Sequence, residues 1–145
     1  MTPRVVWDPR LPQETRAAFE VHFLPLMRML PAWVTDVRID YDGDDMTSGL
    51  YVGAQYEYRR GTIFVCAPFL HLGTETRRRA VLHEIVHFGL DPVDNLLLAL
   101  IERLDEDGDL HAWAREQRRV ALESSTCDLT ESMTKAMQCA CSSLD

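Results

Sequence analysis

The chain has no long hydrophobic run. Its longest uninterrupted apolar stretch, Leu96 to Ile101, is six residues long, whereas a membrane span needs about 20. The first residues, Met1-Thr2-Pro3-Arg4, also lack the apolar segment of a secretory signal. We therefore expect an intracellular, cytoplasmic protein that has no membrane partner.

Basic side chains are scarce as well. The 145 residues include 15 Lys and Arg against 23 Asp and Glu, which gives a net charge of −8. Sequence-independent binding of nucleic acid relies on a basic surface, so we do not expect a nucleic-acid partner. A chain of this length buries a core without disulfides and is typical of one domain. We expect that domain to cover residues 1–137, followed by a disordered tail at 138–145.

Cysteine is also sparse, and no two cysteines have the Cys-x-x-Cys spacing of a zinc or redox site. The four are Cys66, Cys127, Cys139 and Cys141. In a reducing compartment this pattern predicts free thiols rather than disulfides or a cysteine-based zinc site.

The pattern of apolar residues predicts both helices and strands. Spacings of three and four predict helices at about 11–30, 75–88, 93–104 and 110–137, with Gly89 and Pro92 separating the second helix from the third. Alternation predicts strands at 37–41 and 50–58, and a short apolar run predicts a strand at 62–66. A helix, three short strands and then more helices define an α+β fold, with a small antiparallel sheet packed against the helices.

One predicted helix contains the motif His-Glu-x-x-His, as His83-Glu84-Ile85-Val86-His87. On a helix, His83 and His87 are one turn apart and leave the same face, so both imidazoles can bind one metal ion. Glu84 can then act as general base for a metal-bound water that attacks a carbonyl. The opposite side of the helix is apolar and is expected to face the core, with Ala80, Val81, Ile85 and Phe88. The plainer alternative leaves the histidines partly exposed and Glu84 in a surface pair with Arg77 or Arg78.

The segment from Arg79 to His87 resembles the active helix of zincin (HExxH) metallopeptidases. The helix and short sheet before it resemble the minimal intracellular and phage-type domains of the glutamate-zincin, or gluzincin, branch. The resemblance implies a bound Zn²⁺, hydrolysis of a peptide or protein substrate, and a glutamate on a later helix as third zinc ligand. No Gly-x-x-His pattern follows His87, which favours this later ligand over a third histidine.

The last predicted helix offers several candidates for that ligand. Glu123 is preferred, because it lies beside an apolar stripe that includes Leu122 and Leu129. Glu116 lies among arginines and is expected in solvent. Asp128, Glu131 and His111 stay open as alternatives, and Asp128 is also a candidate acceptor for the free N–H of a ligating histidine.

Other groups have less defined roles. Zincins polarise the developing oxyanion with a further side chain, and the sequence does not choose among Tyr56, Tyr58, His71, His111, Arg118 and Arg119. His22 is expected at the edge of the core. One alternative function is an inactive zincin-like module that binds a protein partner.

The window from Asp105 to Glu116 suggests a second alternative, a calcium-responsive helical regulator. Its acidic residues follow most of an EF-hand loop, but Leu110 occupies the position that needs glycine. The simpler interpretation is a solvated loop in which Asp109 caps the following helix.

Overall fold

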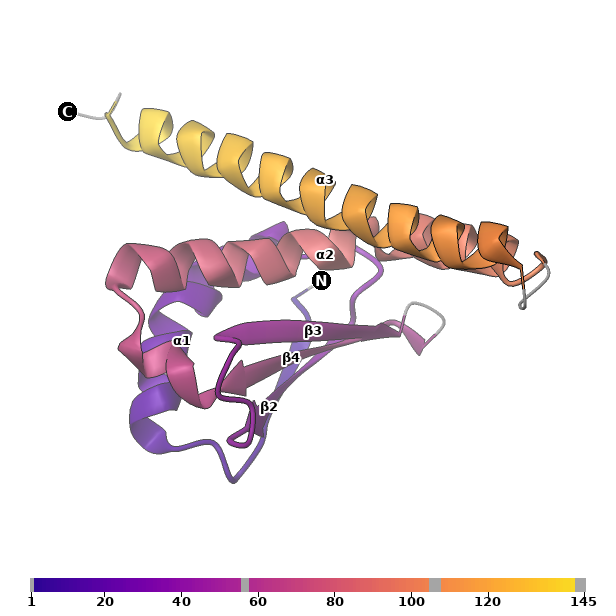
Figure 1. Cartoon of the computed structure of the whole chain (residues 1–145). Coiled ribbons are helices and arrows are strands. Elements are labelled where there is room, and N and C mark those ends of the chain that lie inside the picture. Colours follow the sequence, from indigo (N-terminus) through magenta and orange to yellow (C-terminus); the bar gives the residue numbers. More distant parts are fainter. Residues whose placement is uncertain (1, 56–57, 105–107, 143–145) are drawn as a thin grey trace. The chain divides into compact units, whose positions relative to one another are not determined.

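The computed structural model describes residues 2–55, 58–104 and 108–142. The chain forms two compact units, Met1–Gly89 and Leu90–Asp145. The first unit contains, in chain order, β1 (Arg4–Trp7), α1 (Gln13–Leu26), η1 (Met27–Met29), β2 (Asp36–Asp42), β3 (Leu50–Gln55), β4 (Arg60–Cys66), η3 (Ala67–His71) and the beginning of α2 (Thr74–Ile101). The second contains the rest of α2 and α3 (Asp109–Ser142). The elements, coloured along the chain in Figure 1, confirm the predicted α+β class.

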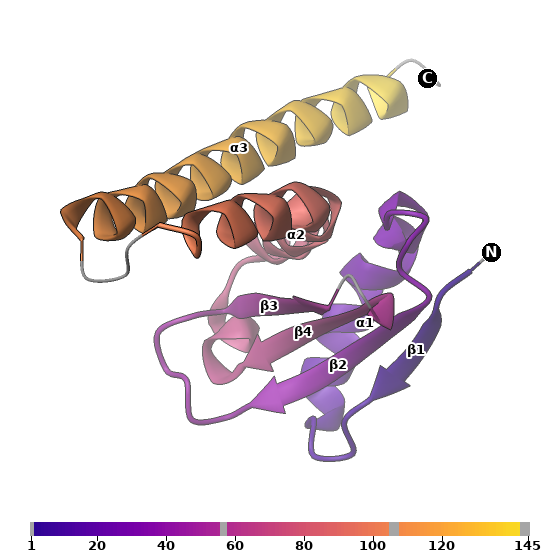
Figure 2. The ribbon, with the colours of Figure 1, turned by 90° about the vertical axis from the view of Figure 1, so that its right-hand side faces the viewer.

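The four strands form one mixed sheet in the order β1-β2-β4-β3, which Figure 2 shows side by side. β1 and β4 both run parallel to β2, and only β3 and β4 are antiparallel. The prediction of an antiparallel sheet was therefore wrong for two of these pairings. The physical reason is the connections. α1 links β1 to β2 as a crossover, and residues 43–49 carry the chain past the place that β4 later takes between β2 and β3.

The core of the first unit comes from alternating strand residues and one face of each helix. Val37 and Ile39 of β2 and Ile63 and Val65 of β4 are fully buried. The alternation predicted for residues 37–41 is thereby confirmed for Val37 and Ile39. The ring of Phe19 lies 5.2 Å from that of Phe23 and 5.8 Å from that of Phe69, measured between centroids. Burying each such side chain stabilises the fold by about 1.5–3 kcal/mol.

α2 runs without interruption from Thr74 to Ile101, so the prediction of two helices at 75–88 and 93–104 was wrong. No glycine in the described part of the chain has a positive φ, so Gly89 does not adopt the left-handed conformation that ends many helices. Pro92 lies inside the helix, where it removes one backbone N–H and costs about 3 kcal/mol. The buried apolar side chains of α2, from Val81 to Phe88, all precede Pro92, and their packing stabilises the helix against this cost.

α3 confirms the helix predicted at 110–137 and extends it to Ser142. The helix thus continues into the stretch 138–145 for which we expected a tail, and residues 143–145 lie outside the described residues. Thr126 and Thr130 are its most buried side chains. Within the described ranges, none of the helices combines the length and the apolar character that crossing a membrane requires.

Candidate metal centre

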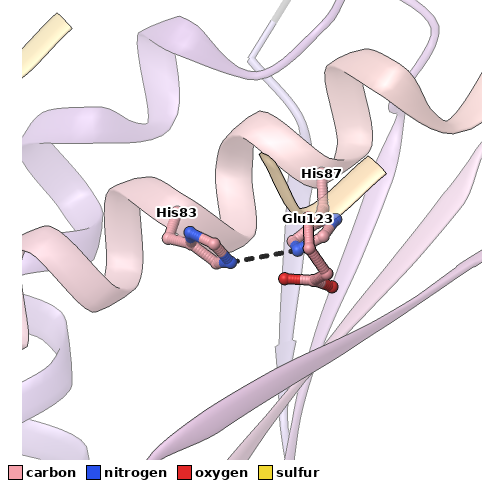
Figure 3. A group of neighbouring side chains, drawn as sticks. All are labelled: His83, His87 and Glu123. Atoms are coloured by element: carbon pink, nitrogen blue, oxygen red, sulfur yellow. Dashed lines mark hydrogen bonds between the residues drawn. The ribbon is translucent and has the colours of Figure 1, made fainter. Parts of the chain in front are cut away.

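His83 and His87 lie one helical turn apart on α2, in the first unit. Their Nε2 atoms are 3.1 Å from each other, as the dashed line in Figure 3 marks. The two rings meet edge to face, with centroids 4.8 Å apart and an interplanar angle of 77°. Both side chains are half-buried. The expectation that these imidazoles share one face of a helix is confirmed.

The separation of the two nitrogens fits a shared metal ion. A zinc ion about 2.05 Å from each Nε2 would subtend an N–Zn–N angle of roughly 98°, close to the ~109° of a tetrahedral site. The required bond lengths therefore need little movement of either ring. The same pair without a metal needs one nitrogen to donate and the other to accept.

The rest of this turn of α2 fixes the orientation of the histidines. Val81, Ile85 and Phe88 are at most 1% exposed, as the sequence predicted for the opposite side of the helix. Burying this stripe leaves the histidine face turned away from the core centre. Glu84 is 7% exposed, which contradicts the surface position that the plainer alternative gave it.

A buried thiol belongs to the same unit. Cys66, the last residue of β4, is fully buried. Burial is the largest of the influences that raise its pKa to about 12, and the charges of Asp45, Asp42 and Glu84 act in the same direction. The thiol stays protonated at neutral pH, whereas a zinc ligand must be a thiolate. Cys66 is therefore no ligand, and Cys66, Cys127 and Cys139 are free as predicted.

In the second unit, the candidate third ligands differ in their partners. Glu116 pairs with Arg119 at 2.6 Å, and Glu131 pairs with Lys135 at 2.7 Å. Both carboxylates are therefore already engaged by cations of the same helix.

The position of each candidate around α3 distinguishes them further. Glu123 precedes the buried Thr126 by three residues, which puts it about 60° away around the helix. Asp128 follows Thr126 by two residues and lies about 200° away, on the opposite side. Glu123 is exposed on the flank of the buried stripe, as its place beside the apolar residues suggested. His111 is 8% exposed, and its Nε2 has no partner among the described residues.

The groups considered for oxyanion stabilisation are spread over both units. Tyr58 and His71 are exposed in the first unit, and Tyr56 lies outside the described residues. In the second unit, Arg119 pairs with Glu116, and Arg118 donates to Asp94 at 2.5 Å. Arg118 was one of the candidates for oxyanion stabilisation, and the sequence contained no signal for its partner Asp94, 24 residues away.

His22 of α1 is buried, with 9% of its surface exposed. Burial is the main cause of its lowered pKa, and the positive charges of Arg77 and Arg78 contribute. It is therefore a neutral core histidine, as predicted, rather than a candidate ligand.

The acidic window considered for calcium is helical where the structure describes it. α3 begins at Asp109, so Leu110 and Ala112 lie within its first turns. The carboxylate of Glu116, which would close a calcium loop, accepts two hydrogen bonds from Arg119. This conformation differs from an EF-hand loop. Asp109 lies in the first turn of the helix, and its role as a cap stays a prediction. Asp105 and Asp107 lie outside the described residues.

Comparison of the chain with protein-family models, with curated proteins and with solved structures found no match.

Proposed function

We propose that this chain is a zinc-dependent metallopeptidase. In this proposal His83, His87 and Glu123 hold the metal, and Glu84 is the general base. The observation that carries the proposal is the 3.1 Å separation of the two Nε2 atoms on one face of α2. Figure 3 draws the three proposed ligands, each of which offers one ligand atom of a type that binds zinc.

The surroundings of the acidic residues on α3 support Glu123 as the third ligand. Glu116 pairs with Arg119 and Glu131 pairs with Lys135, whereas Asp128 lies on the side of the helix opposite the buried Thr126. Glu123 lies on the flank of that buried side and is exposed.

The proposed mechanism assigns one task to each group. When bound, the metal supplies a Lewis acid that polarises the amide carbonyl and makes a water molecule acidic. The imidazoles of His83 and His87 bind through Nε2, and the carboxylate of Glu123 offsets part of the positive charge. Glu84 takes the proton of the attacking water on a carboxylate oxygen and passes it to the leaving amine. The low exposure of Glu84 keeps bulk water away from that transfer.

The test measures bound zinc by elemental analysis and hydrolysis of an unfolded protein such as casein. The wild type is expected to contain one zinc per chain and to cleave. His83→Ala is expected to lose zinc. Glu84→Gln is expected to keep zinc and to lose roughly 10²- to 10⁴-fold in rate, the usual contribution of a general base.

Two further variants test the third ligand. Glu123→Gln is expected to lower zinc content, and Asp128→Asn, a matched change on the opposite side of α3, is expected to leave it unchanged. A wild type without stoichiometric zinc would contradict the whole proposal. Stoichiometric zinc with no cleavage would favour the inactive binding module instead.

A further inference from the structure

The second unit has no fully buried apolar side chain among the residues that the structure describes. The buried apolar residues of the chain lie between Leu11 and Phe88, all of them in the first unit. The second unit nevertheless consists of a long segment of α2 and the 34 residues of α3. Helices in proteins gain most of their stability from the packing of an apolar face. The described part of this unit therefore lacks the core that usually stabilises a pair of helices.

Large apolar side chains of this unit are exposed instead. On α2, Val93, Leu96 and Leu100 follow one another at the spacing of three and four residues that forms a coiled-coil seam. On α3 the same spacing extends from Leu110 to Val120, with Gln117 as its polar member. The apolar members of the two seams and the neighbouring Leu97, which together we call the apolar face, are each between 42% and 60% exposed: Val93, Leu96, Leu97, Leu100, Leu110, Trp113 and Val120.

The two seams border the same small cavity between α2 and α3. Val93 and Leu97 line this cavity from α2, and Ala121 lines it from α3. Gln117 and Leu110 lie only about 40° and 20° away from Ala121 around the axis of α3. The apolar face is therefore continuous across both helices of the unit.

The area and the charge of the apolar face fit a second copy of this chain. Its exposed fractions correspond to roughly 700 Å² per chain, so pairing of two copies would bury about 1,400 Å², the size of a standard interface. Monomeric proteins rarely expose so large a continuous apolar patch. No member of either seam is charged, although the chain has a net charge of −8. Two copies that meet through this face therefore bring no carboxylates together at its centre.

We propose that this chain forms a two-fold symmetric dimer through the apolar face of its second unit. Both copies use the same patch in such an interface, so their helices together enclose the core that one unit lacks. Gln117 lies within this interface, where a single polar residue specifies the oligomeric state at a cost in stability. The inference does not depend on the metal centre.

The test is sedimentation equilibrium of the full chain. Interfaces of this size bind with micromolar or tighter affinity, so at about 10 to 100 µM the chain is expected to sediment as a dimer, at twice its mass of 16.6 kDa. The same result is expected in EDTA, which separates dimerisation from zinc binding.

Substitutions within the apolar face are expected to change the dissociation constant of the dimer. Leu100→Glu and Trp113→Glu each place a charge in the face and are expected to weaken dimerisation by roughly 30-fold or more, as at interface hot spots. Leu24→Glu is the matched control, because Leu24 on α1 is 52% exposed and Leu100 is 51% exposed. It is expected to change the dissociation constant less than two-fold.

Gln117→Leu tests the same face in the opposite direction. It removes the polar member of the α3 seam and is expected to tighten the dimer. This variant keeps the test decisive if a glutamate variant does not fold, which circular dichroism shows first. A wild type that stays monomeric at about 100 µM would overturn the proposal and leave the face for a different protein. A dimer that Leu24→Glu weakens as much as Leu100→Glu does, or that none of the variants in the face changes, would place the interface elsewhere and overturn it too.

Discussion

The Nε2 atoms of His83 and His87 face each other across 3.1 Å on α2. Two imidazoles this close share one hydrogen, so one ring is the donor and the other the acceptor. In the proposed metal site, a divalent cation would take the place of that hydrogen and use both lone pairs. The arrangement would then need little reorganisation on binding, which favours affinity.

Zinc is expected to stabilise the folded chain. A ligand that binds only the native state at 100 times its dissociation constant adds about 2.7 kcal/mol to the unfolding free energy. The measurement is urea denaturation with and without zinc. His83→Ala should abolish the effect, while His71→Ala, which removes an exposed histidine of η3, should retain it. Equal stabilisation of both variants would show that zinc binds elsewhere.

Gly89→Ala is expected to stabilise the protein by about 0.5–1 kcal/mol, because alanine is the better residue in a helix interior. A Cβ at this exposed position meets no atom within 4 Å. Chemical denaturation of the full chain measures the difference. If a helix instead ended at Gly89 in the left-handed conformation, the same substitution would destabilise the protein.

Gly61→Ala is expected to destabilise the fold by about 1–3 kcal/mol, the usual cost of overpacking a core. A Cβ at position 61 would lie 2.6 Å from two atoms of the buried Phe88 ring. Gly53→Ala is the matched control on the neighbouring strand, where the nearest atom is 3.6 Å away, in Phe64. Equal urea midpoints for the two variants would contradict the close approach of Phe88 to β4.

Tyr51→Phe is expected to lower the unfolding free energy at intermediate pH and to have little effect at strongly acidic or strongly alkaline pH. The Tyr51 hydroxyl donates to Asp42 at 2.7 Å. This bond is the main cause of the lowered pKa of Asp42 and of the raised pKa of Tyr51, which reaches about 12. The stabilisation that this hydrogen bond contributes is therefore fully present below the ordinary tyrosine pKa of about 10 and is lost as pH rises towards 12.

The acid side of the same pair follows from the lowered pKa of the Asp42 carboxyl group. The contribution is present above the ordinary Asp42 pKa and is lost as pH falls through the lowered value. Urea denaturation of wild type and Tyr51→Phe across pH should give a difference that shrinks at both ends. A difference independent of pH would show that the lost hydroxyl acts only through packing.

Cys66 is expected to resist alkylation while Cys127 reacts. Cys66 is buried and its pKa is raised to about 12, whereas Cys127 and Cys139 are exposed. The reactive species is the thiolate. Iodoacetamide labelling followed by mass spectrometry of the peptides should show Cys66 modified only after denaturation. Labelling of native Cys66 at the rate of Cys127 would mean that β4 opens readily.

Local signals predicted most elements of the fold but not how the strands pair. The alternation of Val37 and Ile39 identified β2, and the helical spacing of Phe19 and Phe23 identified α1. Strand order depends on where the connections travel, and no local pattern encodes that path. β1 was missed because its four residues, Arg-Val-Val-Trp, do not alternate between polar and apolar.

Those parts of the candidate site that depend on residues close in sequence were predictable, and those that depend on residues far apart in sequence were not. The relation of His83 to His87 follows from helix geometry alone, so the sequence was sufficient. Glu84 was assigned a role without any sign of its burial, which depends on the core around it. The partnership of Asp94 and Arg118 joins residues 24 positions apart, and its partners could be identified only from the folded structure.

The same helix belongs to both compact units, and this determines how the protein can be dissected. Expression of residues 1–89 alone would cut α2 after Gly89 and leave the last four helical carbonyls without their donors. Such a fragment keeps His83 and His87 on a fraying end and lacks Glu123. A loss of metal by that fragment would therefore have two causes that the experiment does not separate. One is the fraying of the helix end, and the other is the absence of the proposed ligand Glu123. Point substitutions in the full chain are the more informative way to divide the roles of the two units.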